Sequence, residues 1–149
     1  DDERLWGGSL EEIHRTLQVG IRSGHPDTRT NEMPAFGRDE LLEPQQIRDV
    51  TEYVLSISGQ DADTEAAERG TAIFVEQCVA CHGEGGKGNI EMGAPNLTDR
   101  IWLYGGSRSA ILEMVRNPRS GVMPFWEGRL SSETIKQLAV YVHSLGGGE

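Results

Sequence analysis

The sequence predicts an all-α protein, and three observations lead to that class. Apolar residues recur at spacings of three and four in several segments, which places them on one face of a helix. Ser, Asp and Pro residues stand at the starts of these segments, where helix caps and first turns favour them. Gly-rich and Pro-containing stretches separate the segments, as expected for loops.

The first predicted helix begins after Ser9, a good N-cap, and Glu12 stands at the capping-box position. Ile13 and Leu17 then fall on one face of the helix. The turn-forming stretch from Gly24 to Asp27 is expected to end it.

The second predicted helix has Pro44 in its first turn, where a missing backbone N–H costs nothing. Its apolar stripe consists of Ile47, Val50, Val54 and Ile57. The polar stretch Gly59 to Asp63 reads as a linker. A third helix is capped by Asp63 or Thr64, and Gly70 shares a face with Phe74, where it would let another helix cross closely.

The third helix leads into Cys78-Val79-Ala80-Cys81-His82, which is typical of a c-type haem attachment site. Two thiols on one face of a helical turn can bond to one side of a porphyrin, and His82 follows as an axial iron ligand. A redox disulfide would be expected in a βαβ setting, which the sequence does not show. A zinc site would need further ligands, but there is no second Cys pair and the other His residues are scattered.

The chain contains an internal repeat. Four features of the first copy return in the same order: Leu5-Trp6-Gly7-Gly8-Ser9 as Leu103-Tyr104-Gly105-Gly106-Ser107, Ile13 and Leu17 as Ile111 and Val115, Arg22-Ser23-Gly24 as Arg119-Ser120-Gly121, and Met33-Pro34 as Met123-Pro124. The apolar stripe of the second helix returns as Ile135, Leu138, Val142 and Leu145, with Tyr53 matching Tyr141. This last helix is capped by Ser131 or Ser132, and Gly146 to Gly148 form a loose tail.

The repeat predicts two tandem domains, of which the first is incomplete at its N-terminus. Residues 1–60 form the C-terminal half of a first domain without its own Cys-x-x-Cys-His motif, and residues 61–149 form a complete domain with one covalent haem c. The chain then reads as a fragment of a two-haem protein, cut inside the first haem domain.

The sixth iron ligand is expected to be a methionine, because a thioether favours reduced iron and raises the potential. Met114 lies in a helical pattern and suits core packing, whereas Met92 suits a lining or surface position in a Gly-rich loop. Met123 is favoured because it lies in a loop between two helices, which Pro124 stiffens.

Met33 is the counterpart of Met123 and is predicted to ligate the haem of the first domain. The two half-domains could instead exchange, so that Met33 completes the haem of Cys78 and Cys81 while Met123 serves the other haem. Both loops have the same chemistry, so the sequence leaves both alternatives open.

The net charge of the 149 residues is −10, which argues against nucleic acid and against anionic membrane surfaces as partners. It favours a basic protein partner whose association is steered by charge and weakened by salt.

No apolar run approaches the roughly 20 residues of a membrane span, and no signal peptide is present. There is no Ser/His/Asp set and no carboxylate cluster that would suggest hydrolysis, and a small-molecule substrate is not expected. Arg108, Arg116 and Arg119 could pair with haem propionates, but solvated helix faces are the simpler interpretation.

The chain resembles the periplasmic part of the dihaem cytochrome c subunit, subunit III, of cbb3-type cytochrome c oxidases. In the first copy the resemblance rests on Leu5 to Ser9, Gly20 to Ser23, His25 to Arg29 and Glu32 to Gly37. In the second copy it rests on Cys78 to Gly83, Gly93 to Asp99, Trp102 to Gly106 and Gly121 to Pro124.

This resemblance implies cytochrome c folds in tandem and haem c bound through Cys78, Cys81, His82 and a methionine, with a second haem in the intact protein. It implies an electron-transfer subunit, not an enzyme by itself, that passes electrons from a donor cytochrome c toward the membrane subunit that reduces oxygen. The expected location is the periplasmic side of the bacterial inner membrane, with this chain soluble and its anchor missing. The alternatives are a free dihaem shuttle, or a sensing or catalytic haem with an open sixth position.

Overall fold

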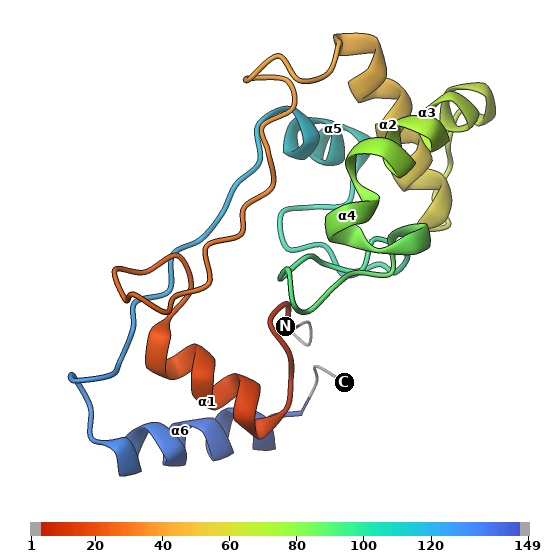
Figure 1. Cartoon of the computed structure of the whole chain (residues 1–149). Coiled ribbons are helices and arrows are strands. Elements are labelled where there is room, and N and C mark those ends of the chain that lie inside the picture. Colours follow the sequence, from red (N-terminus) through yellow and green to blue (C-terminus); the bar gives the residue numbers. More distant parts are fainter. Residues whose placement is uncertain (1–3, 147–149) are drawn as a thin grey trace. The chain divides into compact units, whose positions relative to one another are not determined.

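The computed structural model describes residues 4–146, and its regular structure is helical (Figure 1). The helices are α1 (Leu10–Val19), α2 (Pro44–Ile57), α3 (Thr64–Gln77), α4 (Val79–His82), the 3-10 turn η1 (Glu84–Gly86), α5 (Arg108–Arg116) and α6 (Ser132–Ser144). Within the described range, β-pairing is limited to isolated bridges. The predicted all-α class is confirmed.

The helices begin where the capping residues predict. Ser9 and Glu12 form a reciprocal capping box at the start of α1. The Asp63 side chain accepts a hydrogen bond from the backbone N–H of Ala66 at 3.0 Å, so Asp63 rather than Thr64 caps α3. Ser131 caps α6 in the same way. Of the predicted glycine tail, Gly147 and Gly148 lie outside the described residues.

The end predicted for α1, between Gly24 and Asp27, is wrong, because the helix ends at Val19. Gly20 follows with a φ of +70°, a left-handed conformation that favours glycine. The backbone of Ile21 then pairs with that of Met123 through N–H···O bonds of 3.0 and 2.9 Å. The helix therefore ends at a glycine C-cap, which the long-range pairing of Ile21 follows directly, before the predicted turn is reached.

The chain folds into two compact units, each built from both predicted copies. Unit 1 contains the residues up to Glu32, Ile90–Gly93 and the residues from Ser120 onward, whereas unit 2 contains Met33–Asn89 and Ala94–Arg119. Neither unit coincides with the segments 1–60 and 61–149, so that division remains a prediction about the repeat. Each copy contributes its first helix to one unit and its Met-Pro segment and last helix to the other.

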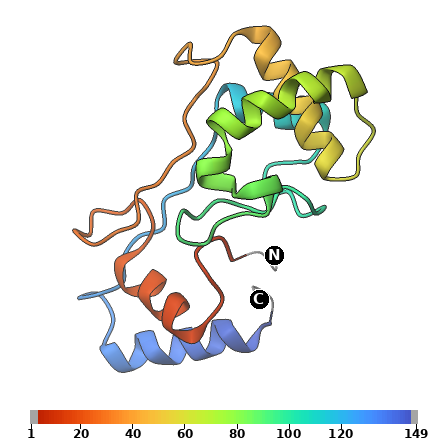
Figure 2. The same cartoon turned by 45° about the vertical axis from the view of Figure 1, so that its right-hand side comes forward.

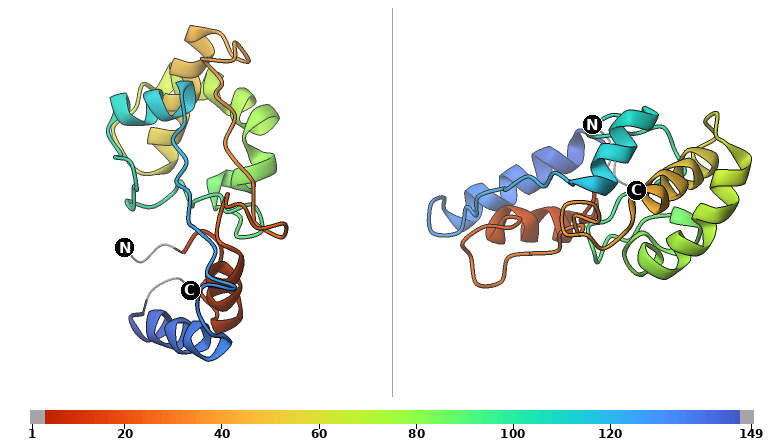
Figure 3. Two further views of the ribbon diagram at one scale, coloured as in Figure 1. Left: turned by 90° about the vertical axis from the view of Figure 1, so that its left-hand side faces the viewer. Right: turned by 90° about the horizontal axis from the view of Figure 1, so that it is seen from above.

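Unit 1 is built on α1, from the first copy, and α6, from the second, which lie side by side (Figures 2 and 3). Its buried side chains come from both helices and from the segment before α1: Trp6, Ile13, Val19, Ile135 and Ala139. The Trp6 ring also holds the loop Ile90–Gly93, since a Cβ on Gly93 would lie 2.2 Å from the ring. The Arg29 guanidinium lies 5.2 Å from the centre of the same ring.

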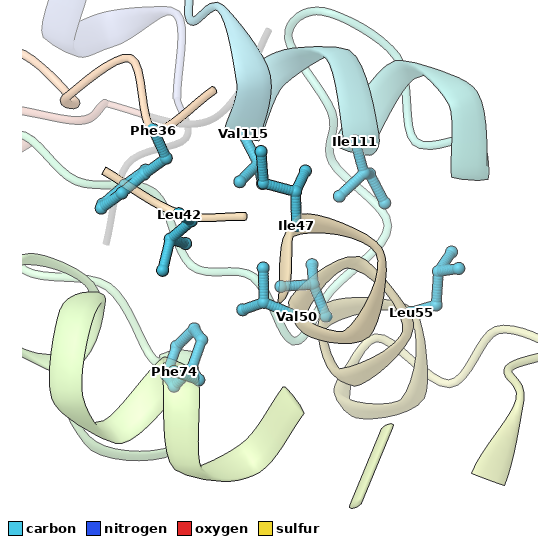
Figure 4. Packing of buried hydrophobic residues seen from close by; sticks show 9 residues of the cluster. Phe36, Leu42, Ile47, Val50, Leu55, Phe74, Ile111 and Val115 are labelled. Atoms are coloured by element: carbon cyan, nitrogen blue, oxygen red, sulfur yellow. The ribbon is translucent and has the colours of Figure 1, made fainter. Parts of the chain in front are cut away.

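Unit 2 packs α2, from the first copy, against α3 and α5, from the second. Its core is one apolar cluster (Figure 4): Phe36, Leu42, Ile47, Val50, Val54, Leu55, Phe74, Ile111 and Val115. Phe74 is 1% exposed, and its ring centre lies 4.8 Å from that of Tyr53. Full burial of each such side chain stabilises the fold by about 1.5–3 kcal/mol.

Helices α2 and α3 approach each other most closely at Gly70, as the sequence predicts. A Cβ on Gly70 would lie 2.1 Å from the carbonyl oxygen of Asp49 and 3.0 Å from the Tyr53 Cβ. No side chain larger than hydrogen fits there without moving the α2 backbone.

Two buried carboxylates of α2 are held by arginines from neighbouring helices of unit 2. Asp49 accepts hydrogen bonds of 2.9 and 3.1 Å from Arg69 of α3. Glu52 accepts bonds of 2.6 and 3.1 Å from Arg108 of α5, and one of 2.9 Å from the backbone N–H of Asp63. The hydrogen bonds from these arginines are the main cause that lowers the pKa of both carboxyls, against the opposing effect of burial.

Replacing Gly70 by Ala is expected to destabilise the chain by about 1–3 kcal/mol, the usual cost of overpacking a tight contact. The measurement is denaturant unfolding at equilibrium. Gly24→Ala is the matched control, because nothing lies within 4 Å of a Cβ there, and its midpoint should stay close to that of the parent chain. Equal midpoints for the two variants would contradict the close crossing.

Stability is also expected to fall on acidification, partly through Asp49 and Glu52. Their pKa values are lowered on folding, so their contribution is present above the unfolded-state pKa and disappears as pH falls through the folded-state pKa. Unfolding free energies measured between pH 7 and pH 3 should decline less in an Asp49→Asn/Glu52→Gln variant than in the parent. An identical decline in both would exclude these carboxyls as a cause.

Candidate haem-binding site

The Cys-x-x-Cys-His motif forms the turn that joins α3 to α4 in unit 2. The Cys78 N–H donates to the carbonyl of Phe74 at 2.9 Å, which ties the motif to the most buried ring of the core. The Cys78 carbonyl then accepts from the N–H groups of Cys81 and His82, at 3.1 and 2.9 Å. Both thiols are free and half-buried, so both are available to form thioether bonds.

The Cys78 thiol lies in an environment unlike that of an activated redox cysteine. It packs against the apolar core of unit 2, and this burial, with a smaller contribution from Cys81, raises its pKa to about 11. Redox-active thiols have lowered pKa values. Within residues 4–146, no group of three or more His, Cys, Asp or Glu side chains is arranged to hold a metal ion.

His82 is oriented by a backbone carbonyl. Its Nδ1 lies 3.1 Å from the oxygen of Pro95, and because a carbonyl can only accept, Nδ1 carries the proton. Nε2 therefore keeps its lone pair, as an iron ligand requires. Burial lowers the pKa of His82, against a smaller opposite effect of the Pro95 bond, and this favours the neutral imidazole that binds metals.

The Gly-rich loop after the motif holds Pro95 in place. The Gly88 N–H donates to the carbonyl of His82 at 2.7 Å, and the Leu97 N–H donates to the carbonyl of Gly86 at the same distance. Gly86 is buried with a φ of +75°, and a Cβ there would lie 2.7 Å from Ile57 Cδ1. The glycines thus allow a close return of the chain that brings the Pro95 carbonyl to the imidazole.

The structure places Met33, rather than Met123, in the unit that holds the Cys-x-x-Cys-His motif. Met33 is half-buried and packs against the same apolar cluster as Cys78. Met123 belongs to unit 1, where its backbone pairs with Ile21. The grouping is the one expected for the exchanged arrangement, while the identity of the iron ligand itself stays a prediction.

The other two methionines have partners of their own. The Met92 sulfur lies 3.4 Å from the Asn31 side-chain nitrogen in unit 1. Met114 lies on α5, and its sulfur accepts from the Arg119 backbone N–H at 3.4 Å. Met92 is half-buried in its loop, as the sequence suggests. Met114, for which the sequence suggests core packing, is half-buried on α5 and is not among the residues of the apolar cluster.

Two features of unit 2 are not predicted by the sequence. The first is the role of the Pro95 carbonyl, because a backbone group leaves no signal in residue identity. The second is the ion pair of Arg108, which the sequence suggests to be a solvated residue or a propionate partner, whereas Arg108 binds Glu52. A comparison of the two copies could have shown the second point, since Glu52 stands opposite a valine, Val140, in the repeat.

The residues present fit a covalently attached haem. Two free thiols, an imidazole with an available Nε2 and a thioether occur in one unit. Half-buried apolar side chains lie with them against the core, namely Val79, Leu97 and Trp102. This donor set is that of a His/Met-ligated c-type haem.

A family model described as "Cytochrome C oxidase, cbb3-type, subunit III" matches residues 65–142. The chain belongs to this family. It is 58% identical to the cbb3-type cytochrome c oxidase subunit FixP of Bradyrhizobium sp. strain ORS 278 and 57% identical to FixP of Bradyrhizobium diazoefficiens, in each case over the whole chain and 52% of the relative. It is 55% identical to subunit CcoP of Cereibacter sphaeroides, with the same coverage.

The chain therefore spans about half the length of the curated relatives that it matches. Membership of a cytochrome c family implies covalently bound haem c, in agreement with the donor set of unit 2. In the part of the chain that the structure describes, no helix combines the length and the apolar character needed to cross a bilayer.

Proposed function

We propose that the chain is an electron-transfer cytochrome whose haem c is bonded to Cys78 and Cys81 and ligated by His82 and Met33. The observation that carries the proposal is the presence of all four side chains in unit 2, with His82 already oriented by Pro95. The haem would supply a one-electron couple. The chain's own residues anchor it, fix the imidazole and fill the sixth position.

Support for Met33 comes from its packing. Met33 shares an apolar cluster with Cys78, and the buried residues Ala35 and Phe36 follow it directly. A methionine packed against the core in this way can stay bound to the same iron in both oxidation states. The reorganisation energy of electron transfer then stays small. Met123 has no such connection to Cys78 within unit 2, because it belongs to unit 1.

Met123 would then complete a second haem, whose attachment motif lies outside this sequence. In this view the chain contains parts of two tandem cytochrome c domains. Support comes from α6, where Tyr141 and Leu145 are 61% and 65% exposed. Their counterparts in the repeat are Tyr53 and Ile57 of α2, and Tyr53 packs on Phe74 of the helix that leads to the haem motif. A corresponding helix would cover the face of α6.

The curated relatives are named as subunits of cbb3-type cytochrome c oxidases, and we place this chain in the same role. It would accept electrons from a donor cytochrome c and pass them toward the oxygen-reducing subunit, on the periplasmic side of the bacterial inner membrane. The net charge of −10 supports a basic donor, because opposite charges speed the encounter of two proteins.

Met33→Ala is expected to abolish the Met–iron absorption band of the haem-loaded chain. The reduction potential should fall by on the order of 100 mV, a fraction of the roughly 0.8 V range that axial ligands control. The reduced variant should also bind carbon monoxide, which the parent should not.

Met123→Ala is the matched control, since it removes the same side chain from the equivalent loop of unit 1 and should leave the band in place. If Met123→Ala abolishes the band and Met33→Ala leaves it in place, the sixth ligand is Met123 instead of Met33. Carbon monoxide binding by the parent chain would favour a sensing or catalytic haem.

The rate of reduction by a basic cytochrome c is expected to fall steeply as ionic strength rises, about tenfold or more between low salt and 0.5 M, because salt screens the attraction between the partners. Stopped-flow kinetics at several salt concentrations would measure this. An acidic cytochrome c of similar potential should show a flat or rising dependence, and equal behaviour of the two donors would contradict a basic partner.

A further inference from the structure

The two copies offer interchangeable helices, so the apolar pattern by itself does not specify which helices pack together. Helices α2 and α6 carry the same apolar stripe in the repeat, and so do α1 and α5. In the structure α1 packs with α6, and α5 packs with α2. The unexchanged alternative would pair α1 with α2 and α5 with α6. Something other than the stripe must distinguish these two arrangements.

Charge distinguishes the helices. Glu52 of α2 corresponds to Val140 of α6, and Arg108 of α5 corresponds to Leu10 of α1. The observed pairing joins the two charged positions in unit 2, where Arg108 binds Glu52 at 2.6 and 3.1 Å. The corresponding apolar residues, Leu10 of α1 and Val140 of α6, both lie in unit 1.

The alternative pairing would mismatch both contacts. Helix α2 on α1 would set Glu52 against Leu10, and α6 on α5 would set Val140 against Arg108. The Glu52 side chain is only 11% exposed, whereas that of Arg108 is 50% exposed. The main penalty therefore falls on the carboxylate, because a buried charge without its partner costs far more than a partly exposed ion pair contributes.

A second ion pair acts in the same direction. Asp49 of α2 is bound by Arg69 of α3, and its side chain is 6% exposed. Its counterpart in α6 is Gln137, which carries no charge to meet Arg69. Helix α6 in the place of α2 would thus lose the charged contact to α3 as well as that to α5.

We propose that the Arg108–Glu52 pair, assisted by Arg69–Asp49, selects α2 rather than α6 for the haem-binding unit and thereby specifies the exchanged arrangement. The selection works mainly through the cost of burying Glu52 without Arg108 in the alternative pairing. Because Met33 precedes α2 in the chain, the same pair determines which methionine joins Cys78, Cys81 and His82. This last step rests on the ligand assignment proposed above, whereas the choice of helix does not.

The test exchanges the charged and apolar positions between helices in the haem-loaded chain. A Leu10→Arg/Arg108→Leu variant removes the partner of Glu52 in the observed pairing and supplies one, at position 10, in the alternative. Leu10 and Val140 are 45% and 58% exposed in unit 1, so the Glu52 contact carries the test. Adding Glu52→Val and Val140→Glu gives a quadruple variant in which the observed pairing is matched again. This quadruple variant is the control for stability, since it contains every change of the double variant.

Helix choice is measured directly by the distance between spin labels on Ser56 of α2 and Ser109 of α5, in the reduced chain. Both labelled positions are exposed and belong to unit 2. The parent and the quadruple variant should show one short, narrow distance. The double variant should lose at least nine-tenths of that population, a tenfold shift.

A double variant that keeps the parental distance would overturn the proposal, and the lengths of the connecting segments would then impose the pairing. Loss of the distance in both variants would also overturn it, because the charges would act only on general stability.

The identity of the methionine ligand is measured separately. In the double variant the Met–iron band should depend on Met123 and no longer on Met33. If the band of the parent chain does not depend on Met33, the ligand assignment fails, while the label distances still decide the helix choice.

Discussion

The packing of α2 against α3 is the contact on which the rest of unit 2 depends. At Gly70 the two helices approach so closely that a single methyl group would meet the carbonyl of Asp49. This crossing buries Val50 and Phe74, and Phe74 in turn accepts the first hydrogen bond of the Cys-x-x-Cys-His turn. The position of the thiols of Cys78 and Cys81 therefore follows from the crossing of two helices that themselves contain no residue of the motif.

The exchange of helices between copies gives this crossing a functional consequence. Helix α2 comes from one copy and α3 from the other, so the Met-Pro segment that precedes α2 enters the unit of the haem motif. In the proposed arrangement each haem depends on both copies for its two axial ligands.

Much of the local structure could be predicted because it depends on neighbouring residues. The capping box of Ser9 and Glu12, the cap at Asp63 and the close crossing at Gly70 all appear as expected. The end of α1 was predicted too late, because Gly20 already ends the helix in a left-handed conformation. The pairing of Ile21 with Met123, about one hundred residues away, leaves no signal in the local sequence. The contact of the Pro95 carbonyl with His82 could not be predicted either. Every residue has a backbone carbonyl, and only the fold determines which one lies beside the imidazole.

By itself, the sequence determined the all-α class, the haem motif, the two candidate methionines and the repeat that makes them equivalent. Only the tertiary structure decided which of them shares a unit with Cys78. The physical reason is that both copies present the same apolar stripe, so short-range pattern is equally satisfied by either pairing. The two pairings differ in the neighbours that they give to charged side chains such as Glu52 and Arg108. Whether such a side chain stabilises or destabilises a pairing depends on the residue that it meets in the folded chain.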